Sequence, residues 1–304
     1  MWKRFRPSPE FRPVTTIPSG DSVRVRWLGT AGHVIQASGV TLLVDPFLTR
    51  PSLLRTAAMP LRPTPDAWWR WLPSHVDAVL VGHSHYDHLM DAPVIARRTG
   101  ARLAGSRTTA SFARASGVPE DRIHEVPPEG GEVSVGPLRI RFVHSLHGRI
   151  AAGRVPFDGE VREPPTLPAR LWDYRMGGAF GVHVEGPGWS LYHNGSADLV
   201  DTELEGLRAD VILAGLAGRE ATRGYLERLV IALRPSLVVP THHDFFFRPL
   251  DAGPQLLPGI DMEGFVTEMR RLRSGAGIRM PTYEDVLHIP CEGARAGHAA
   301  VSPF

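Results

Sequence analysis

Four residues that can bind metal ions, His83, His85, Asp87 and His88, lie within six consecutive positions. Side chains alternate along an extended chain, so His83 and His85 are expected to project to the same side. Asp87 and His88 follow where the chain is expected to turn into a helix. One loop can therefore offer two imidazoles to one ion, and a carboxylate with an imidazole to a second. Imidazole and carboxylate ligands suit zinc, iron or manganese. The alternative interpretation of the motif is a chance cluster of surface histidines.

The elements around this motif alternate between strand-like and helix-like patterns. A short apolar run over residues 77–81 precedes the motif and predicts a buried strand, and residues 89–98 after it predict a helix. Further strands are predicted at 23–28, 33–36, 40–44, 102–105, 132–135, 138–143, 179–185, 189–193, 211–214 and 237–239, and further helices at 108–116, 220–233 and 262–273. This alternation is typical of an α/β fold.

The composition is that of an ordinary globular protein, with 42% hydrophobic and 22% charged residues among 304. Residues 1–20 are polar and rich in proline, and we expect them to form an N-terminal arm. Residues 21–304 are expected to form a single domain. Within it, residues 148–171 carry many Pro and Gly without periodicity, which predicts a long loop of the kind that often acts as a lid or binding loop.

The charge pattern and the apolar runs exclude several classes of partner. Basic and acidic residues nearly balance, at 34 and 32, and there is no long basic run, so we expect no nucleic-acid partner. No apolar run approaches the roughly 20 residues of a membrane helix, so we expect no insertion into a bilayer. The first 13 residues lack the apolar segment of a secretory signal, which makes the cytoplasm the expected location. The oligomeric state stays open.

The His83–His88 motif resembles the HxHxDH signature of the metallo-β-lactamase superfamily. The resemblance implies a four-layer αββα sandwich, with two facing sheets and helices outside them. It also implies an aspartate behind a ligand histidine, which it orients, and Asp45 matches this position. Within the superfamily, Asp45-Pro46, the run His85–Asp91 and Pro240–His242 look most like the branch that contains ascorbate-phosphate lactonases and the N-acylphosphatidylethanolamine-hydrolysing phospholipase D.

The resemblance implies three further ligands downstream of the motif. His147 is the expected ligand after the strand at 138–143, and His242 is expected after the strand at 237–239. The family then shows a Gly-Asp pair whose carboxylate bridges two ions, but Ser196 follows Gly195 here. Either Asp198 reaches the ions from a longer turn, or Ser196 fills the place and the bridge is weak or missing. His243 would contact the substrate or carry protons.

The implied site has His83, His85 and His147 around one ion and Asp87, His88 and His242 around a second, joined by Asp198. Such ions activate water and polarise a carbonyl or phosphoryl oxygen, and Asp87 could orient the water. We therefore expect a metal-dependent hydrolase of an ester, lactone or phosphodiester bond. It would use one or two divalent ions, with zinc first and manganese or iron as alternatives.

The substrate is expected to be a small molecule, and five arginines in or next to the long loop could bind an anionic group on it. These are Arg149, Arg154, Arg162, Arg170 and Arg175. Their alternative role is ordinary solvated charge on a loop. Two other classes of function stay open: a redox or oxygen-handling metalloprotein on the same fold, and a degenerate binding protein without catalysis, which the departure at Ser196 motivates.

Overall fold

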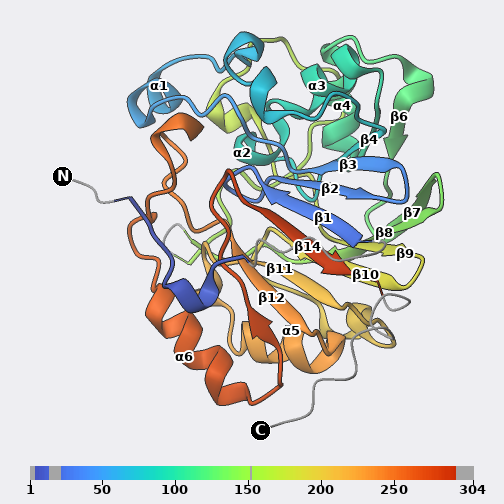
Figure 1. The fold of residues 1–304 in the computed structure, drawn as a ribbon. Coiled ribbons are helices and arrows are strands. Elements are labelled where there is room, and N and C mark those ends of the chain that lie inside the picture. The colour runs from blue at the N-terminus through green and yellow to red at the C-terminus, as the bar shows by residue number, and fades with distance from the viewer. Residues whose placement is uncertain (1–3, 14–21, 151–152, 292–304) are drawn as a thin grey trace, which may run out of the picture.

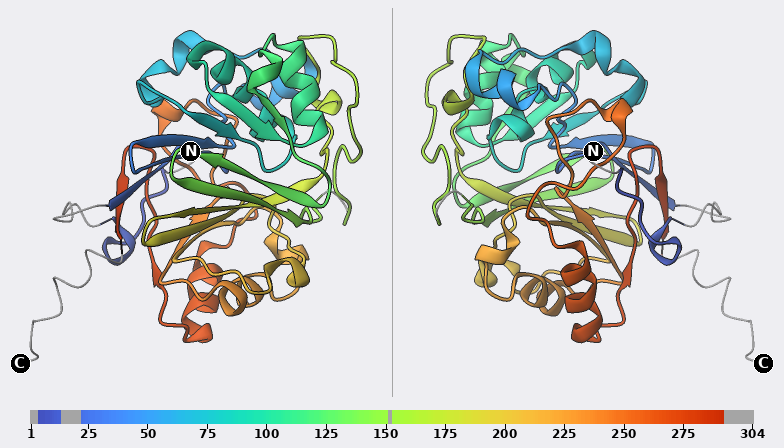
Figure 2. Two further views of the ribbon diagram at one scale, coloured as in Figure 1. Left: turned by 90° about the vertical axis from the view of Figure 1, so that its right-hand side faces the viewer. Right: turned by 90° about the vertical axis from the view of Figure 1, so that its left-hand side faces the viewer.

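The computed structural model describes residues 4–13, 22–150 and 153–291. Two seven-stranded sheets face each other, with strand orders β14-β1-β2-β3-β4-β5-β6 and β13-β12-β11-β10-β9-β8-β7. Helices α1 to α4 cover the outer face of the first sheet, and α5 and α6 cover the outer face of the second (Figures 1 and 2). This arrangement confirms the predicted four-layer αββα sandwich.

The strands are β1 (Ser22–Trp27), β2 (His33–Ala37), β3 (Val40–Val44), β4 (Ala78–Leu80), β5 (Arg102–Gly105), β6 (Ile123–Glu125), β7 (Gly130–Val135), β8 (Leu138–Ser145), β9 (Ala179–Gly186), β10 (Trp189–Asn194), β11 (Val211–Gly215), β12 (Leu237–Thr241), β13 (Gly277–Ile278) and β14 (Val286–Pro290). The α-helices are α1 (Leu53–Ala58), α2 (Tyr86–Leu89), α3 (Ala92–Thr99), α4 (Arg107–Ala115), α5 (Tyr225–Leu233) and α6 (Met262–Leu272). Short 3₁₀ turns, such as η7 (Arg219–Ala221), lie in the connections.

The strand directions bring the ends of distant strands to one edge of the sandwich. Strands β8 and β10 are each antiparallel to β9, and β10, β11 and β12 are parallel, so β8, β10 and β12 all run the same way. In the first sheet, β3 and β4 are parallel. The two sheets meet at this edge, where Phe180 donates its N–H to the carbonyl of Gly82 at 2.8 Å and His83 forms a β-bridge with Ala179. The loops that follow these strands therefore lie close together.

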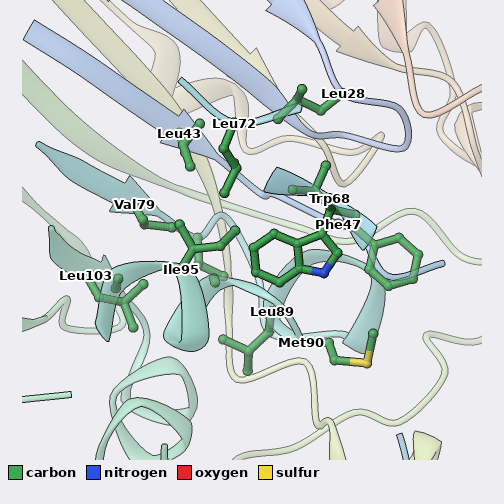
Figure 3. Packing of buried hydrophobic residues seen from close by; sticks show 14 of the residues in the cluster. Leu28, Leu43, Phe47, Trp68, Leu72, Val79, Leu89, Met90, Ile95 and Leu103 are labelled. Carbon is green, nitrogen blue, oxygen red and sulfur yellow. The ribbon is translucent and has the colours of Figure 1, made fainter. Parts of the chain in front are cut away.

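Burial of both faces of the sheets explains why the central strands are apolar throughout. In β3, Leu42 and Val44 lie in the core between the sheets, whereas Leu43 lies in the core under the helices. A strand places successive side chains on opposite faces, so a strand covered on both sides needs apolar residues at every position. Figure 3 shows the helix-covered core, in which Leu43 and Val79 from the sheet pack near Ile95 of α3 and the indole of Trp68.

Several elements differ from the sequence-based prediction. The helix predicted over residues 89–98 is broken into α2 and α3 around Asp91, and Pro occupies the first turn of α3. The helix predicted over residues 220–233 begins only at Tyr225, because Gly224 has a positive φ of 62° after the turn η7. Helix α1 and strands β6, β13 and β14 were not predicted. Strand β14 pairs with β1, far away in the sequence.

The N-terminal residues that the structure describes pack on the second half of the molecule. Phe5 donates its N–H to Pro254 and Phe11 accepts from Met280, both at 2.7 Å. Both phenylalanines contact the core under α5 and α6. Residues 14–20 of the expected arm lie outside the described residues. In the expected loop at 148–171, residues 153–170 form neither helix nor strand, and Val161 hydrogen-bonds to Thr108 of α4. No described helix combines the length and apolar character needed to cross a bilayer.

Candidate metal centre

The first group of ligand atoms belongs to His83, His85 and His147. Their ligand atoms lie within 4.8 Å of one another. His83 follows β4, His85 precedes the first turn of α2, and His147 follows β8 in the other sheet. The ring centroids of His83 and His147 are 4.7 Å apart, and those of His85 and His147 are 4.8 Å apart. Three imidazoles from two sheets thus converge on one point.

The second group belongs to Asp87, His88 and His242, which also lie within 4.8 Å of one another. The Asp87 carboxylate lies 3.3 Å from Nε2 of His242 and 3.8 Å from Nε2 of His88. The groups adjoin, because the rings of His83 and His88 have centroids only 3.8 Å apart. The structure therefore brings six of the seven expected ligands together.

Hydrogen bonds on the outer side of three imidazoles aim their other ring nitrogen into the centre. Nδ1 of His88 pairs with Asp45 at 2.9 Å, Nδ1 of His147 with the carbonyl of Gly148 at 2.7 Å, and Nε2 of His85 with the carbonyl of Pro156 at 2.8 Å. Each acceptor fixes a tautomer in which the opposite nitrogen carries a lone pair. These three nitrogens are thereby available as ligands, two in the first group and one in the second.

Tight backbone turns hold this arrangement. Asp45 and His242 have positive φ values of 45° and 52°, which are uncommon for residues other than glycine. The N–H of His242 donates to Thr30 at 2.7 Å, and the N–H of Gly82 donates to Asp45 at 2.6 Å. A Cβ on Gly82 would lie 3.2 Å from the Asp45 carboxylate, so the position favours glycine. The surrounding structure holds Asp45 and His242 in these uncommon backbone conformations, next to the ligand groups.

Burial and mutual repulsion keep the imidazoles of the first group neutral. Burial and the neighbouring imidazoles lower the pKa of His83 well below its usual value. Burial likewise lowers the pKa of His85 to about 4 and that of His147 to about 3. At neutral pH all three rings are therefore unprotonated and can bind a cation through a lone pair.

The Asp87 carboxylate gives the second group its negative charge. Burial raises the pKa of Asp87, but His88 and His242 outweigh that effect, and the pKa falls well below its usual value. Burial lowers the pKa of His88, but Asp45 and Asp87 raise this pKa by more than burial lowers it, so the net shift is upward. Asp87 is ionised at neutral pH and offers its oxygens to a cation.

An unpartnered nitrogen shows that the residues present fit a bound metal. Nε2 of His83 is buried and has no hydrogen-bond partner among the described residues. A buried polar atom without a partner costs free energy, so an absent ligand is the natural explanation. Five imidazoles and one carboxylate are also the donor types that zinc, iron and manganese accept.

Asp198 does not reach this centre. Its carboxylate accepts from the N–H of Leu199 at 2.8 Å, and it belongs to neither ligand group. The side chain of Asn194 accepts the N–H groups of Ser196 and Ala197, which closes a tight turn in which Ala197 has a φ of 56°. This turn carries Asp198 past the centre. Ser196 does not replace Asp198 as a bridging residue, because it has no carboxylate and its hydroxyl donates to Asn194 at 3.2 Å.

His243 also points away from the centre. It is fully buried, its ring stacks on Trp27 with centroids 4.5 Å apart, and it contacts the ring of Phe5. Burial lowers its pKa to about 4. The tight turn at His242, whose φ is 52°, places His242 toward the centre and His243 in the core. The expected role of His243 in substrate contact or proton transfer has no geometric support.

A cavity of about 840 Å³ opens over the centre. All six ligand residues of the two groups line it, together with Gly195. Of the five arginines considered as anion-binding groups, Arg149 lines the cavity. Elsewhere Arg162 pairs with Glu160, and Arg170 and Arg175 donate to backbone carbonyls within or beside the loop.

Most of the cavity wall comes from residues that sequence reasoning did not identify. Helix α1, the turn at residues 217–221 and the segment 257–260 contribute to it, as do Phe157, Phe246 and Phe247. Phe246 both lines the cavity and packs in the fold, because its ring also contacts Phe47. For α1 a local signal existed, since Ser52 caps the helix by accepting the N–H of Arg55.

Comparisons with known proteins agree with this geometry. A family model described as "Beta-lactamase superfamily domain" matches residues 24–242. A UPF0173 metal-dependent hydrolase of Methanopyrus kandleri is 30% identical over 256 residues, which cover 81% of this chain and 97% of that protein. A second protein of that name, from Anaeromyxobacter dehalogenans, is 31% identical over 231 residues, covering 73% and 75% of the two chains.

Solved structures share the fold. A metallo hydrolase from the archaeon Ignicoccus hospitalis superposes with a TM-score of 0.60 at 19% identity, covering 89% of this chain and all of that one. A diiron β-hydroxylase from Streptomyces venezuelae superposes with a TM-score of 0.57 at 14% identity, covering 90% of this chain and 55% of that one. At these identities the likeness concerns the fold alone.

Proposed function

The chain belongs to the β-lactamase superfamily, with UPF0173 metal-dependent hydrolases among its relatives, and from this membership we propose that it hydrolyses an ester, lactone or phosphodiester bond at a two-ion centre. The observation that carries the proposal is the pair of ligand groups that line one cavity, together with the buried Nε2 of His83, which lacks a partner among the described residues.

We assign His83, His85 and His147 to one ion and Asp87, His88 and His242 to the other, with zinc expected first and manganese or iron as alternatives. Divalent ions held there would lower the pKa of a water molecule toward about 7 and polarise the oxygen of the scissile carbonyl or phosphoryl group. Asp45 orients His88 through the 2.9 Å hydrogen bond, and the carbonyls of Gly148 and Pro156 orient His147 and His85.

Asp87 has a second role in this proposal. Its carboxylate faces the cavity floor and is ionised at neutral pH, so it can accept a hydrogen bond from the attacking water and fix the direction of its lone pair. The substrate must displace other water from the cavity, and this strengthens the electrostatic interactions at the centre. Asp198 and His243 have no part in the mechanism.

Hydrolysis of ester, lactone and phosphodiester substrates identifies the bond type. The narrower resemblance to ascorbate-phosphate lactonases and to the lipid-cleaving phospholipase D is a hypothesis within this proposal, and lactone and phosphodiester substrates test it. The single carboxylate in the two ligand groups leaves a strongly positive centre once two dications bind, which favours anionic or polarised oxygen in the substrate.

The test is a substrate panel of p-nitrophenyl esters, lactones and bis-p-nitrophenyl phosphate with zinc-, manganese- or iron-loaded protein. We expect turnover of one class, lost on chelation and reduced at least about 1,000-fold in Asp87→Ala. His124→Ala is a matched control, because this histidine lies on β6 outside both ligand groups. Equal activity in wild type and Asp87→Ala would refute the assigned role.

The same experiment separates the two other classes of function. Purification with iron and a visible absorption band, without hydrolysis of any substrate, would favour a redox or oxygen-handling protein. Stoichiometric metal binding without either property would favour a binding protein without catalysis.

A further inference from the structure

The wall of the cavity above the metal centre is predominantly apolar. Beyond the ligand residues, apolar side chains come from α1, from the loop after His147, from the segments around residues 217–221 and 257–260, and from the segment after His242. They include Leu53, Ile150, Phe157, Leu171, Phe246, Phe247, Leu257 and Ile260. Figure 1 shows α1 next to the orange segment that follows β12, so parts of the chain far apart in sequence face each other across the opening.

Two of these apolar side chains are exposed to solvent. Leu53 on α1 is 57% exposed and Ile150 is 52% exposed, although both line the cavity. Isolated exposed leucines are common on protein surfaces, but here two come from separate elements and border one opening. An apolar ligand that enters the cavity would cover both of them.

Beyond the ligand residues, the polar side chains on the wall are few: Thr56, Tyr86, Arg149 and Glu220. Arg149 is exposed and makes no ion pair within the described part of the chain, whereas Glu220 pairs with Arg219 at 3.3 Å. A sugar or nucleotide substrate needs hydrogen-bonding groups along its length, and this wall does not supply them. The polar chemistry is concentrated at the metal centre.

We infer that the substrate carries an extended apolar group, an alkyl or aryl chain of about eight carbons or more, next to the scissile bond. The inference rests on the proposed function, because the metal centre fixes where the bond lies. The cavity of about 840 Å³ is of the size that encloses a drug-sized ligand, so it has room for such a chain. In the reaction the water oxygen bonds to the carbonyl carbon or phosphorus, the bond from that atom to the leaving oxygen breaks, and the leaving oxygen takes up a proton that the water gives up.

The first arm of the test is a chain-length series of p-nitrophenyl esters from acetate to decanoate, kept below their aggregation concentrations, with metal-loaded protein. Full burial of each methylene favours binding by about fourfold, and octanoate has six methylenes more than acetate, so even a twofold gain for each should raise kcat/KM about 60-fold. A rate that is flat or falls with chain length would overturn the inference.

Two neighbouring leucines on α1 provide a matched pair of variants. Leu53→Gln removes an apolar group from the cavity wall, whereas Leu54→Gln changes a residue that is 79% exposed and does not line the cavity. Glutamine is a good helix former, and both positions are exposed, so both variants should fold. We expect Leu53→Gln to lower kcat/KM for octanoate about fivefold or more, with little change for acetate, and Leu54→Gln to behave as wild type.

A binding arm separates failure of this inference from failure of the proposed function. Alkanoates of four to twelve carbons compete with the fluorescent dye 1-anilinonaphthalene-8-sulfonate for metal-loaded wild type and for both variants. Affinity that rises with length and weakens in Leu53→Gln alone, without hydrolysis of any ester, lactone or phosphodiester in the panel, would support an apolar ligand in the cavity and refute the hydrolytic function. Metal-dependent hydrolysis with no length dependence in either arm would leave the function standing and overturn the inference.

Discussion

Two buried clusters of polar side chains share the segment 242–244. They differ in how many of their polar atoms have hydrogen-bond partners within the protein. His242 belongs to the metal centre. Asp244, two residues later, belongs to a cluster that we call the arginine cluster, formed by Arg50, Asp244, Tyr283 and Thr30. All four are almost fully buried. Each cluster brings charged or ionisable groups out of water, which is costly unless they have partners.

The arginine cluster is nearly complete within the protein. Arg50 forms an ion pair with Asp244 and donates to the hydroxyl of Tyr283 at 2.9 Å. Tyr283 in turn donates to Asp244 at 2.6 Å, and the N–H of Thr30 donates to Asp244 at 2.8 Å. Burial lowers the pKa of Arg50, but Asp244 and Tyr283 outweigh it and raise the pKa above its usual value. Only Nε of Arg50 lacks a partner among the described residues.

The metal centre, in contrast, gathers donor atoms that do not satisfy one another within the protein. Its imidazoles disfavour one another's protonation, and Nε2 of His83 has no partner within the described chain. The arginine cluster therefore serves the fold, whereas the donor set of the metal centre suits a bound cation. The two are connected, because the carbonyl of Thr30 accepts the N–H of His242 at 2.7 Å and the hydroxyl of Thr241 at 2.8 Å.

The largest effect is expected from breaking the arginine cluster. Asp244→Ala leaves the Arg50 charge buried without its partner, so the free energy of unfolding should fall by about 3–5 kcal/mol. Chemical denaturation measures it. The matched control is Asp251→Ala, which removes an ion pair with Arg70 where both side chains are about 60% exposed, and which should cost less than about 1 kcal/mol. Similar losses in the two variants would contradict the structural role of the arginine cluster.

Asp91 offers an intermediate case, a buried carboxylate with hydrogen bonds but no cation. It accepts the N–H groups of Leu48 and Thr49 and the hydroxyl of Thr49. Burial nevertheless raises its pKa to about 6. Between pH 7 and 4 the folded protein therefore binds a proton more readily than the unfolded chain, and stability rises as the pH falls.

Comparison with Asp91→Asn isolates this effect. Relative to the variant, metal-free wild type should gain about 2–3 kcal/mol of unfolding free energy between pH 7 and pH 4. Denaturation curves at several pH values measure the difference. Parallel pH profiles for the two proteins would show that Asp91 is ionised over this whole range and would contradict the expected shift.

The smallest effect concerns Asp45, a satisfied residue that serves the metal centre. Asp45→Asn weakens the hydrogen bond that orients His88, so metal affinity should fall about 10–100-fold, with little change in the fold. Chelator competition measures the affinity. Asp77→Asn changes a carboxylate that accepts the N–H of Thr41 away from the centre, and its metal affinity should match that of wild type. An unaltered affinity in Asp45→Asn would place this residue with the structural cluster.

The sequence predicted the parts of the site that depend on local spacing. The positions of His83, His85, Asp87 and His88 follow from one strand end and one helix start, and the structure groups them as that spacing required. His147 and His242 came from a resemblance, and the structure places them with the others. The central strands were predictable because burial on both faces leaves uninterrupted apolar runs.

What the sequence could not predict depends on turns and on contacts between distant segments. Asp198 was expected at the centre, but the side chain of Asn194 closes the turn before it. The apolar cavity is built from segments around residues 53–57, 149–157, 217–221 and 246–260, and no local pattern relates these segments. The pairing of β14 with β1 and the arginine cluster are likewise long-range, since Arg50 and Asp244 lie 194 residues apart.

The central claim is that the two ligand groups bind metal ions, and metal analysis of the purified protein by mass spectrometry tests it most directly. After loading with zinc and dialysis, wild type should retain close to two ions per chain. A His83→Ala, His85→Ala double variant should retain one at most, because it loses two of the three ligands of the first group. Equal metal content in the two proteins, or no bound metal in wild type, would contradict the account.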